Sequence, residues 1–415
     1  MQLIFQQRYG DKPVKLPDET KQQILRTAAS LLESSTNWES PLINEDFSLQ
    51  ETKYAIAKVR DQVGYNSHEN IHALMMKRTN EDFVKVVNEL ANKCLRSGKF
   101  PEETKKDQKL LREKHNAEDL NEDGAYRPIT VESLISKSIV TMVRRRLVWK
   151  LESTEKLSQT QEAYRNGREP NDMTVRMVQS IQESWNDNKT VIVFISDFKG
   201  FFESIWRPLL TIKLQRAGIC GDILRLIDDY LKDRKIRFDI NSFTTEWMTT
   251  DVGSPQGSSL STILTNTYSS DNIEDNFDHG EFSDDNLKWE AHESEVEAAR
   301  ILQTRIDEFG KWCEVNNIDT SCTKTKIMVF RNKRCPRPYN KIRLTLNGEE
   351  IEEVSCHKVV GTLLDNELTF IPHFEKVVKS GYAALNQVKR FCVNQKVPSL
   401  DTNITLYRLL SSSSS

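Results

Sequence analysis

The chain of 415 residues has no closely paired cysteines, no long apolar run and no apolar leader at its start. Its seven cysteines are scattered without a C-x-x-C spacing, which is typical of reduced thiols in an intracellular compartment. A membrane-spanning helix needs roughly 18 consecutive apolar residues, and a secretion signal needs a charged segment followed by an apolar one. Because the sequence has neither, we expect an intracellular protein that does not enter a membrane.

Positive charge is not in excess either. The 58 Lys and Arg residues are balanced by 61 Asp and Glu residues, which gives a formal net charge of -3. Proteins that coat nucleic acid usually carry a large excess of Lys and Arg. The composition therefore argues against that class and leaves room for a local basic groove. A chain of this length is expected to form two or three substructures around a sizeable core.

Helical spacing of apolar residues predicts a helical N-terminal part. One apolar face lies within residues 24–32, and Ser48 followed by Glu51 predicts a capping box at the start of the next helix. A third helix is expected around residues 83–95. The basic stretch that follows, residues 99–114, fits a solvated charged face as well as it fits a binding surface.

Runs of β-branched and aromatic residues predict strands in the middle of the chain. Residues 191–195 (Val-Ile-Val-Phe-Ile) are continuously apolar, as in a strand buried on both faces, whereas residues 236–240 alternate as in a half-buried strand. Two more strands are expected at residues 327–330 and 342–346, the second followed by an Asn-Gly turn. Since helices and strands mix without regular alternation, the sequence predicts an α+β fold.

Three aspartates stand where strands end. Asp197 follows the buried strand, and Asp284 and Asp285 follow Phe-Ser in a strand–turn–strand context. A single Asp in such a place is usually a turn former, but two adjacent ionised carboxylates repel each other unless a divalent cation neutralises them. Three carboxylates from two neighbouring strands suit a pair of Mg²⁺ ions, which can activate an attacking hydroxyl and stabilise the leaving oxygen of a phosphoryl transfer.

Three motifs follow one another in the order found in reverse transcriptases. Residues 197–206 (Asp-Phe-Lys-Gly-Phe-Phe-Glu-Ser-Ile-Trp) resemble the first catalytic motif, an Asp followed five residues later by an aromatic. Residues 254–258 (Ser-Pro-Gln-Gly-Ser) resemble the Pro-Gln-Gly motif, and residues 282–285 (Phe-Ser-Asp-Asp) resemble the Tyr/Phe-Ala-Asp-Asp box. Each motif alone is a weak signal, but their ordered combination is specific.

The resemblance extends to both sides of these motifs. Residues 126–129 resemble a motif of the fingers, and residues 157–172 resemble a segment typical of the non-LTR class. Residues 324–330 are similar to the Lys-Thr-x-x-Met-x-Phe motif, and residues 357–365 are similar to the primer grip. The resemblance covers roughly residues 45–390 and indicates the reverse transcriptase domain of a non-LTR, LINE-type retrotransposon.

This resemblance implies a right-hand polymerase fold with fingers, a palm built on an antiparallel sheet and a partial thumb. In these terms, residues 1–45 form an N-terminal helical extension, residues 46–190 the fingers and the start of the palm, and residues 191–365 the palm. Residues 366–410 form a partial thumb helix, and the serine run at residues 411–415 is a low-complexity tail.

The resemblance also implies RNA-directed DNA polymerisation. Asp197, Asp284 and Asp285 would be catalytic and would hold two Mg²⁺ ions, with Mn²⁺ as the alternative metal. A primer 3′-hydroxyl would attack the α-phosphate of a deoxynucleoside triphosphate, and pyrophosphate would leave. Phe202 would stack under the sugar and exclude a 2′-hydroxyl. The alternative is that Phe202 is an ordinary phenylalanine of the hydrophobic core.

Further contacts to the nucleotide and the nucleic acid are implied. Gln256 would line the incoming nucleotide or the template strand, and Lys324 would lie near the departing phosphates. Two basic residues of the fingers would grip the triphosphate; they are Arg127 and Lys114. Other basic residues would contact the template backbone or the minor groove of the hybrid, unless they simply form a solvated surface; they are Arg165, Arg168, Lys376, Lys379, Lys389 and Arg390.

The chain departs from the family pattern at several positions. Ser283 replaces the usual Ala, Glu281 and Asn286 flank the acidic pair where apolar or small residues are common, and Phe201 replaces a small residue and is expected to crowd the site. Residues 359–360 are Val-Val in place of an aromatic–Leu pair. These departures keep open a second function, that of a catalytically decayed or domesticated nucleic-acid-binding relic, although retention of all three aspartates favours an active enzyme.

An active enzyme of this class would use an RNA template, a DNA primer or target and deoxynucleoside triphosphates, and would work in the nucleus, where it would extend a nicked chromosomal 3′ end. We expect no endonuclease domain in this chain, and no zinc knuckle or RNase H-like carboxylate set after Leu410, so that target cleavage needs another protein. A maturase-like protein or a viral RNA polymerase is a third alternative; the first would need a maturase segment, and the second usually has Gly before its Asp pair.

Overall fold

The computed structural model describes residues 14–37, 40–59, 72–113, 126–240, 243–250, 252–272, 278–321, 323–332, 341–394 and 404. The chain forms two compact units from interleaved segments. Unit 1 comprises Met1–Tyr164, Phe198–Ile273 and Phe309–Thr320; unit 2 comprises Arg165–Asp197, Glu274–Glu308 and Ser321–Ser415. The boundaries of fingers, palm and thumb stay a prediction. The two units are built from interleaved segments and do not correspond to these three parts.

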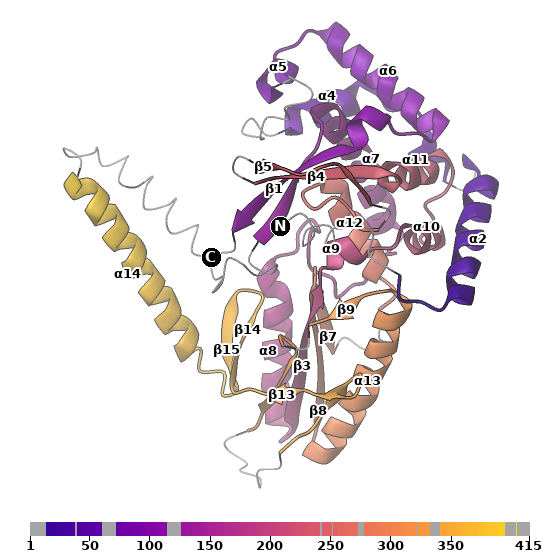
Figure 1. The fold of residues 1–415 in the computed structure, drawn as a ribbon. Helices are drawn as coiled ribbons and strands as arrows, with labels where there is room; N and C mark the ends of the chain where they lie inside the picture. The colour runs from indigo at the N-terminus through magenta and orange to yellow at the C-terminus, as the bar shows by residue number, and fades with distance from the viewer. Residues whose placement is uncertain are drawn as a thin grey trace. The chain divides into compact units, whose positions relative to one another are not determined.

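Unit 1 combines helices with a five-stranded sheet (Figure 1). Its helices are α2 (Asp18–Ser34), α3 (Pro41–Asn44), α4 (Leu49–Lys58), α5 (Ala73–Lys77), α6 (Glu81–Ser97), the 3₁₀ turn η2 (Glu102–Lys105), α7 (Leu134–Ser153), α9 (Phe201–Ser204), α10 (Arg207–Arg216), α11 (Asp222–Leu231) and α12 (Ser259–Ser269). Its strands are β1 (Lys106–Glu113), β2 (Tyr126–Val131), β4 (Arg234–Ile240), β5 (Phe243–Thr244), β6 (Met248–Thr250) and β9 (Asp319–Thr320).

The sheet of unit 1 is mixed. β1 pairs antiparallel with β2 and parallel with β4, and β4 also pairs antiparallel with β5 and β6. Part of the basic stretch before β2 serves this packing, because Lys105 is buried and its ammonium lies 2.8 Å from Asp229 on α11. Lys109 on β1 is buried as well. The expectation of a uniformly solvated face is therefore wrong for these two lysines.

Arg146 on α7 joins three elements of unit 1. Its guanidinium donates to both carboxylate oxygens of Glu51 at 3.0 Å. It also donates to the backbone carbonyls of Ile43, Glu45 and Asp46, in the connection between α3 and α4. Since Glu51 closes the predicted capping box of α4, one buried cation satisfies the helix start and the loop before it.

Unit 2 is built on a sheet whose strands run in the order β13-β10-β3-β8-β7. Its strands are β3 (Thr190–Lys199, in this unit up to Asp197), β7 (His279–Phe282), β8 (Asp285–His292), β10 (Lys326–Phe330), β11 (Thr345–Leu346), β12 (Glu349–Glu350), β13 (Glu352–Glu353), β14 (Cys356–Val359) and β15 (Thr362–Asp365). Its helices are α8 (Pro170–Asn186), α13 (Glu295–Val315, in this unit up to Glu308) and α14 (Ile371–Asn394).

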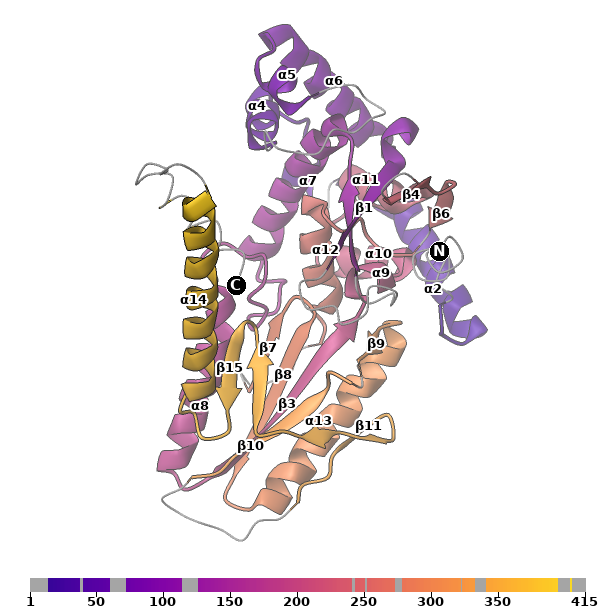
Figure 2. The same cartoon turned by 60° about the vertical axis from the view of Figure 1, so that its left-hand side comes forward.

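Helices cover both faces of this sheet. The alternate residues of β3 that include Val193 pack against α8 through Met173, Met177 and Ile181. α13 lies along the opposite face (Figure 2). Every residue of the run 191–195 is buried, so the prediction of a strand covered on both sides is confirmed. The mixture of helices and strands agrees with the α+β class expected from the sequence.

The other predicted helices and strands are present, but some begin or end at other residues than predicted. The capping box of α4, the helix α6 and the strands β4 and β10 lie where the sequence predicts them. The strand expected at residues 342–346 is shorter, since only β11 pairs, with β12 across a turn in which Asn347 and Gly348 both have positive φ. No helix in the described part of the chain combines the length and apolar character that crossing a membrane requires.

The contacts of Arg146 predict a specific stability difference. We expect Arg146→Lys to lower the free energy of unfolding by about 2 to 4 kcal/mol, because an ammonium cannot replace the forked donors that reach Glu51 and the loop carbonyls. Arg145→Lys, at the adjacent exposed position, is the matched control and should change it by less than about 0.5 kcal/mol. Urea unfolding measures both, and equal values for the two variants would contradict this role.

Candidate active site

The order of strands in unit 2 brings four charged residues to one edge of the sheet, the border that is formed by the ends of its strands. β3 lies between β8 and β10, and it is antiparallel to both. The last residue of β3 in this unit, Asp197, therefore stands opposite Asp285, the first residue of β8. The turn before β10 reaches the same edge and carries Lys324. Directly paired residues of two strands point to the same face, so Asp197 and Asp285 are neighbours.

The hairpin between β7 and β8 presents the third carboxylate. Phe282 pairs with Asp285, which leaves Ser283 and Asp284 as a two-residue turn. Ser283 adopts φ of 60°, the left-handed conformation that tight hairpin turns use. The carboxyl group of Asp284 comes within hydrogen-bonding reach of Asp197. The three aspartates thus lie close together at this edge of the sheet, while their role as metal ligands stays a prediction.

Lys324 neutralises part of this negative charge. Its Nζ donates to Oδ2 of Asp197, while the carbonyl of Asp197 accepts the backbone N–H of Ser321 at 3.0 Å. The backbone N–H groups of Lys324 and Thr325 both bond the carbonyl of Ser321, which fixes the turn. The Lys324 side chain is 65% exposed, so it can also reach a ligand from solvent.

The crowded carboxylates resist ionisation. Burial, and after it the charge of Asp197, raises the pKa of Asp284. Burial, followed by the charges of Asp284 and Asp197, raises the pKa of Asp285 to about 7, and Lys324 opposes this only in part. The ammonium groups of Lys324 and Lys358 both lower the pKa of Asp285, but they do not offset burial and the neighbouring carboxylates, which leaves the site with a need for further positive charge.

The donor set fits divalent cations, although the side chains do not surround an ion-sized point as they stand. Among the residues that the structure describes, no group of three or more His, Cys, Asp or Glu side chains is arranged to hold a metal ion. The carboxylate Oδ2 of Asp197 is bonded by the ammonium of Lys324. Carboxylate oxygens are the ligands that Mg²⁺ prefers. A bound cation would favour ionisation of Asp284 and Asp285, whose pKa is raised first by burial and then by neighbouring carboxylates.

Two departures from the family pattern compensate each other. Glu281 and Asn286 are directly opposite on β7 and β8, and both are buried. Asn286 Nδ2 donates to Glu281 Oε1 at 3.3 Å. The polar residues that replace small or apolar ones therefore bond to each other behind the acidic pair.

A pocket in unit 1 holds two other predicted site residues. Phe202 and Gln256 both line it, and its volume is about 520 Å³. Phe202 is half-buried on α9, with the ring of Tyr164 edge-on at 6.5 Å between centroids. Gln256 lies in the loop 252–258, and its Oε1 is buried without a hydrogen-bond partner among the described residues. The remaining residues of the lining are Lys58, Val59, Glu132, Lys137, Thr141, Tyr164, Gly257, Ser258, Ser259 and Thr262.

Backbone bonds fix the loop 252–258 on two sides. The N–H of Ser254 donates to the carbonyl of Phe202 at 2.8 Å, and the carbonyl of Gln256 accepts the N–H of Thr130, on β2, at 2.8 Å. Gly257 has φ of 112°, and a Cβ there would come within 3.2 Å of the Thr130 carbonyl. Only glycine allows this approach, which explains the Gly of the Pro-Gln-Gly motif in physical terms.

The comparison with known families agrees with these positions. The family described as "Reverse transcriptase (RNA-dependent DNA polymerase)" matches residues 111–364, well over half of the sequence. This chain belongs to the reverse transcriptase family. Membership implies the polymerase fold of the family, and the resemblance to the non-LTR class predicted from the sequence is confirmed.

Similar proteins are polymerases of mobile elements. The chain is 22% identical over 330 residues to "RNA-directed DNA polymerase from mobile element jockey" of Drosophila funebris, which covers 77% of this chain and 35% of that protein. It is 21% identical over 400 residues to the protein of the same name from Drosophila melanogaster, covering 93% and 42%. A "Probable RNA-directed DNA polymerase from transposon BS" of Drosophila melanogaster is 24% identical over 281 residues, covering 66% and 31%. The chain thus spans less than half the length of these relatives.

Phe201, where reverse transcriptases have a small residue, does not line the pocket. It is buried and packs against Phe198 with a centroid distance of 5.0 Å. Phe198 in turn stacks on Phe309 and contacts Trp312. The ring of Phe201 belongs to this aromatic cluster and also packs edge-on against Phe202, with 6.4 Å between centroids. The expectation that Phe201 crowds the site stays a prediction.

The other predicted reverse transcriptase residues lie in several places. Arg127 is on β2, paired with Arg112 on β1, and Lys114 lies outside the described residues. Arg165 and Arg168 are partly buried in the segment before α8. Four basic residues are exposed on α14; they are Lys376, Lys379, Lys389 and Arg390.

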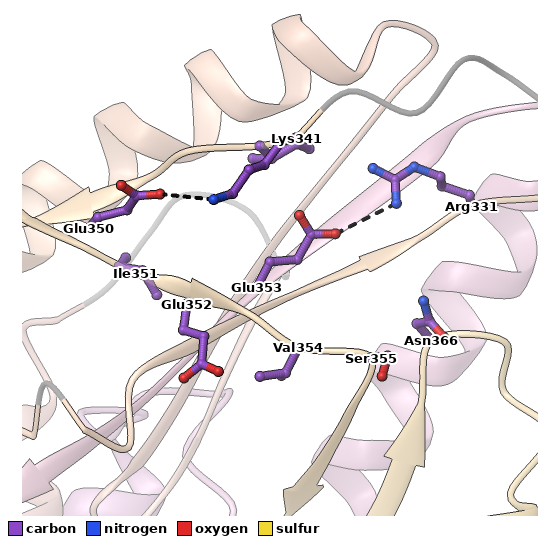
Figure 3. A pocket seen from close by; sticks show the side chains of 10 residues that line it. Arg331, Lys341, Glu350, Ile351, Glu352, Glu353, Val354, Ser355 and Asn366 are labelled. Carbon is purple, nitrogen blue, oxygen red and sulfur yellow. Dashed lines mark ion pairs between the residues drawn. The ribbon is translucent and has the colours of Figure 1, made fainter.

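A second pocket, in unit 2, lies apart from these motifs. Its volume is about 630 Å³, and Figure 3 shows that charged side chains gather in it. Arg331 is 3.7 Å from Glu353, and Lys341 is 3.8 Å from Glu350. None of the predicted site residues lines it. Because its charges are largely paired with one another, we do not include it in the active site.

The raised pKa of Asp285 predicts how stability without metal depends on pH. A carboxyl whose pKa is raised on folding holds its proton more tightly in the folded state, so stability is lost as the pH rises from about 4, its value in the unfolded chain, to about 7. Asp285→Asn removes this charge. In EDTA at pH 8 we expect it to raise the free energy of unfolding by on the order of 2 kcal/mol, with little change at pH 4.

Urea unfolding at the two pH values tests this expectation. Asp187→Asn is the control, because Asp187 is an exposed aspartate of the same unit that pairs with Lys189. It should have no stabilising effect at pH 8. A stability of Asp285→Asn equal to that of the wild type at pH 8 would show that the carboxylates are not in conflict.

Proposed function

We propose that this chain is an RNA-directed DNA polymerase that adds deoxynucleotides to a primer 3′ end. The observation that carries the proposal is the meeting of Asp197, Asp284 and Asp285 at one edge of the sheet, with Lys324 beside them. Three carboxylates from distant segments of sequence, gathered at a cost in electrostatic repulsion, are better explained by catalysis than by folding. Membership of the reverse transcriptase family supports this.

The carboxylates are proposed as the metal ligands. Two Mg²⁺ ions, when bound there, would activate the attacking 3′-hydroxyl and stabilise the oxygen that leaves with pyrophosphate. Asp197, Asp284 and Asp285 would hold these ions and orient them toward the α-phosphate. Because burial and the neighbouring charges raise the pKa of Asp285, binding of a cation would have to displace its proton, since protonated carboxyls bind cations poorly.

Lys324 is proposed to change partners during the cycle. Its ammonium balances Asp197 in the free enzyme. When cations take over that role, the exposed ammonium becomes available to the departing phosphates, to which it would supply charge or a proton. Arg127 and Lys114 are proposed as further donors to the triphosphate, because forked and point cations together suit its many oxygens.

Phe202 and Gln256 are proposed to select the nucleotide. The half-buried ring of Phe202 would pack under the sugar and leave no room for a 2′-hydroxyl. The unpartnered Oε1 of Gln256 would accept a hydrogen bond from the incoming nucleotide or the template. Both side chains line one pocket of unit 1, which supports a common ligand.

The nucleic acid and the architecture complete the proposal. An RNA template and a DNA primer would be contacted by Arg165, Arg168, Lys376 and Lys379. In a right-hand polymerase, the antiparallel sheet of unit 2 would belong to the palm, β1 and β2 to the fingers, and α14 to the thumb. We further propose priming at a nicked chromosomal 3′ end in the nucleus.

Primer extension on an RNA template with purified protein and Mg²⁺ tests the proposed function. We expect incorporation by the wild type and a loss of roughly a thousandfold or more for Asp284→Asn, because the amide removes a metal ligand. Asp187→Asn, at an exposed aspartate outside the motifs that pairs with Lys189, should keep the activity of the wild type.

The same assay separates an enzyme from a relic. A wild type that incorporates nothing but still binds an RNA–DNA hybrid would indicate the catalytically decayed, nucleic-acid-binding protein. Equal incorporation by the wild type and Asp284→Asn would show that the acidic pair is not the catalytic centre.

The position of Phe202 predicts a change in sugar selectivity. We expect Phe202→Val to increase the use of ribonucleotides relative to deoxynucleotides by about ten- to a hundredfold, since the smaller side chain leaves room for a 2′-hydroxyl. Phe309→Leu is the matched control, because Phe309 is a buried phenylalanine of unit 1 that does not line the pocket. The ratio of kcat/KM for the two nucleotides measures the effect. An unchanged ratio in Phe202→Val would make Phe202 an ordinary packing residue.

A further inference from the structure

Three buried polar side chains form a hydrogen-bonded chain beside the pocket of unit 1. The hydroxyl of Tyr230, on α11, donates to Oε1 of Glu132 and is 2.9 Å from Oγ of Ser258. The exposed fractions of the three residues are 2% or less. Glu132 and Ser258 also line the pocket, whereas Tyr230 does not. The phenol therefore connects two wall residues from outside the pocket.

Tyr230 is itself held rigidly. The guanidinium of Arg234 lies over its ring at 4.5 Å and donates to its backbone carbonyl at 3.0 Å. Arg234 is locked in turn by Asp107 on β1, whose two carboxylate oxygens lie 2.6 Å from Nη2. Burial, and after it the charge of Glu132, raises the pKa of Tyr230 well above its ordinary value, so the hydroxyl keeps its proton and remains a donor.

The hydrogen bonds of Tyr230 reach residues on both sides of the contact that holds the Gln256 loop. Ser258 is two residues after Gln256, and Glu132 is two residues after Thr130, whose N–H bonds the Gln256 carbonyl. Tyr230 thus joins the end of β2 to the start of α12, across the contact that fixes Gln256. A shift of either side would leave a buried hydroxyl or carboxylate unpaired, which costs about 1 to 3 kcal/mol.

The loop offers the pocket an acceptor that is already oriented. Gln256 Oε1 is buried and has no hydrogen-bond partner among the described residues. A ligand with a suitable donor would satisfy it, but only if the loop keeps its place relative to β2. Binding that depends on rigid polar groups weakens when the groups that hold them are removed.

We propose that Tyr230 is a positioning residue for the incoming nucleotide: its hydroxyl ties Ser258 to Glu132 and so holds Gln256 where it meets the substrate. This inference rests on the proposed polymerase function and assigns a role to a residue outside the pocket. The predicted consequence is specific, because nucleotide binding depends on the tie, whereas the chemical step depends on the carboxylates of unit 2.

Tyr230→Phe removes the hydroxyl and keeps the ring that packs against Arg234. In steady-state primer extension we expect its KM for the deoxynucleoside triphosphate to rise about tenfold, with kcat within about twofold of the wild type. Ser258→Ala removes the other end of the bond and should raise KM similarly. The double variant should be no worse than either single variant, because both break the same tie.

Tyr268→Phe is the matched control. Tyr268 is an equally buried tyrosine of unit 1, and its hydroxyl bonds the carbonyl of Asn316 at 2.8 Å, away from the pocket lining. It should lose similar stability in a thermal melt and keep the KM of the wild type. This comparison separates positioning from a general loss of stability.

The outcomes distinguish the inference from the function on which it rests. A wild type without incorporation would overturn the polymerase function and the inference with it. An active wild type, with an unchanged KM in Tyr230→Phe or an equal rise in Tyr268→Phe, would overturn the inference alone. If Tyr230→Phe does not fold, Ser258→Ala is judged by the same criteria against Tyr268→Phe.

Discussion

The antiparallel pairing of β3 with β8 is the constraint on which the candidate site of unit 2 depends. It sets Asp197 opposite Asp285, while the hairpin turn adds Asp284 and the neighbouring strand β10 brings Lys324 to the same edge. Because side chains alternate along a strand, a register shift of one residue would turn one of the paired carboxylates to the other face. Apolar contacts of β3 with α8 on one side and its burial on the other oppose such a shift.

The carboxylates at this edge repel one another, and apolar packing elsewhere in unit 2 holds them in place. The carboxylates are partly buried and repel one another, which raises the pKa of Asp285 to about 7. Folding tolerates this repulsion because the sheet packs in an apolar core that includes Val193 and Trp289. The same principle holds in unit 1, where the buried Arg234 is matched by Asp107. In both units, charged groups keep defined positions because apolar surroundings leave them few alternatives.

Local patterns in the sequence predicted much of this. The continuous apolar run became β3, the capping box at Ser48 was present, and the ordered motifs predicted which aspartates meet. What could not be predicted depends on contacts between distant segments. In the sequence, Tyr230 is one of several apolar residues at helical spacing, and nothing near it indicates that its hydroxyl bonds Glu132 and Ser258. The surroundings of Phe201 also depend on a distant segment, because Phe198, which packs on Phe201, stacks on Phe309 far along the chain.

The bonded pair Glu281 and Asn286 has a consequence for how the hairpin of β7 and β8 tolerates substitution. An apolar residue at either position alone would remove a hydrogen bond between two buried side chains, at a cost of about 1 to 3 kcal/mol. Chimaeras that inherit β7 from one parent and β8 from another should carry that same defect. A chimaera that takes β7 and β8 together from one parent would keep the bond, so the two strands beside the acidic pair have to be exchanged together.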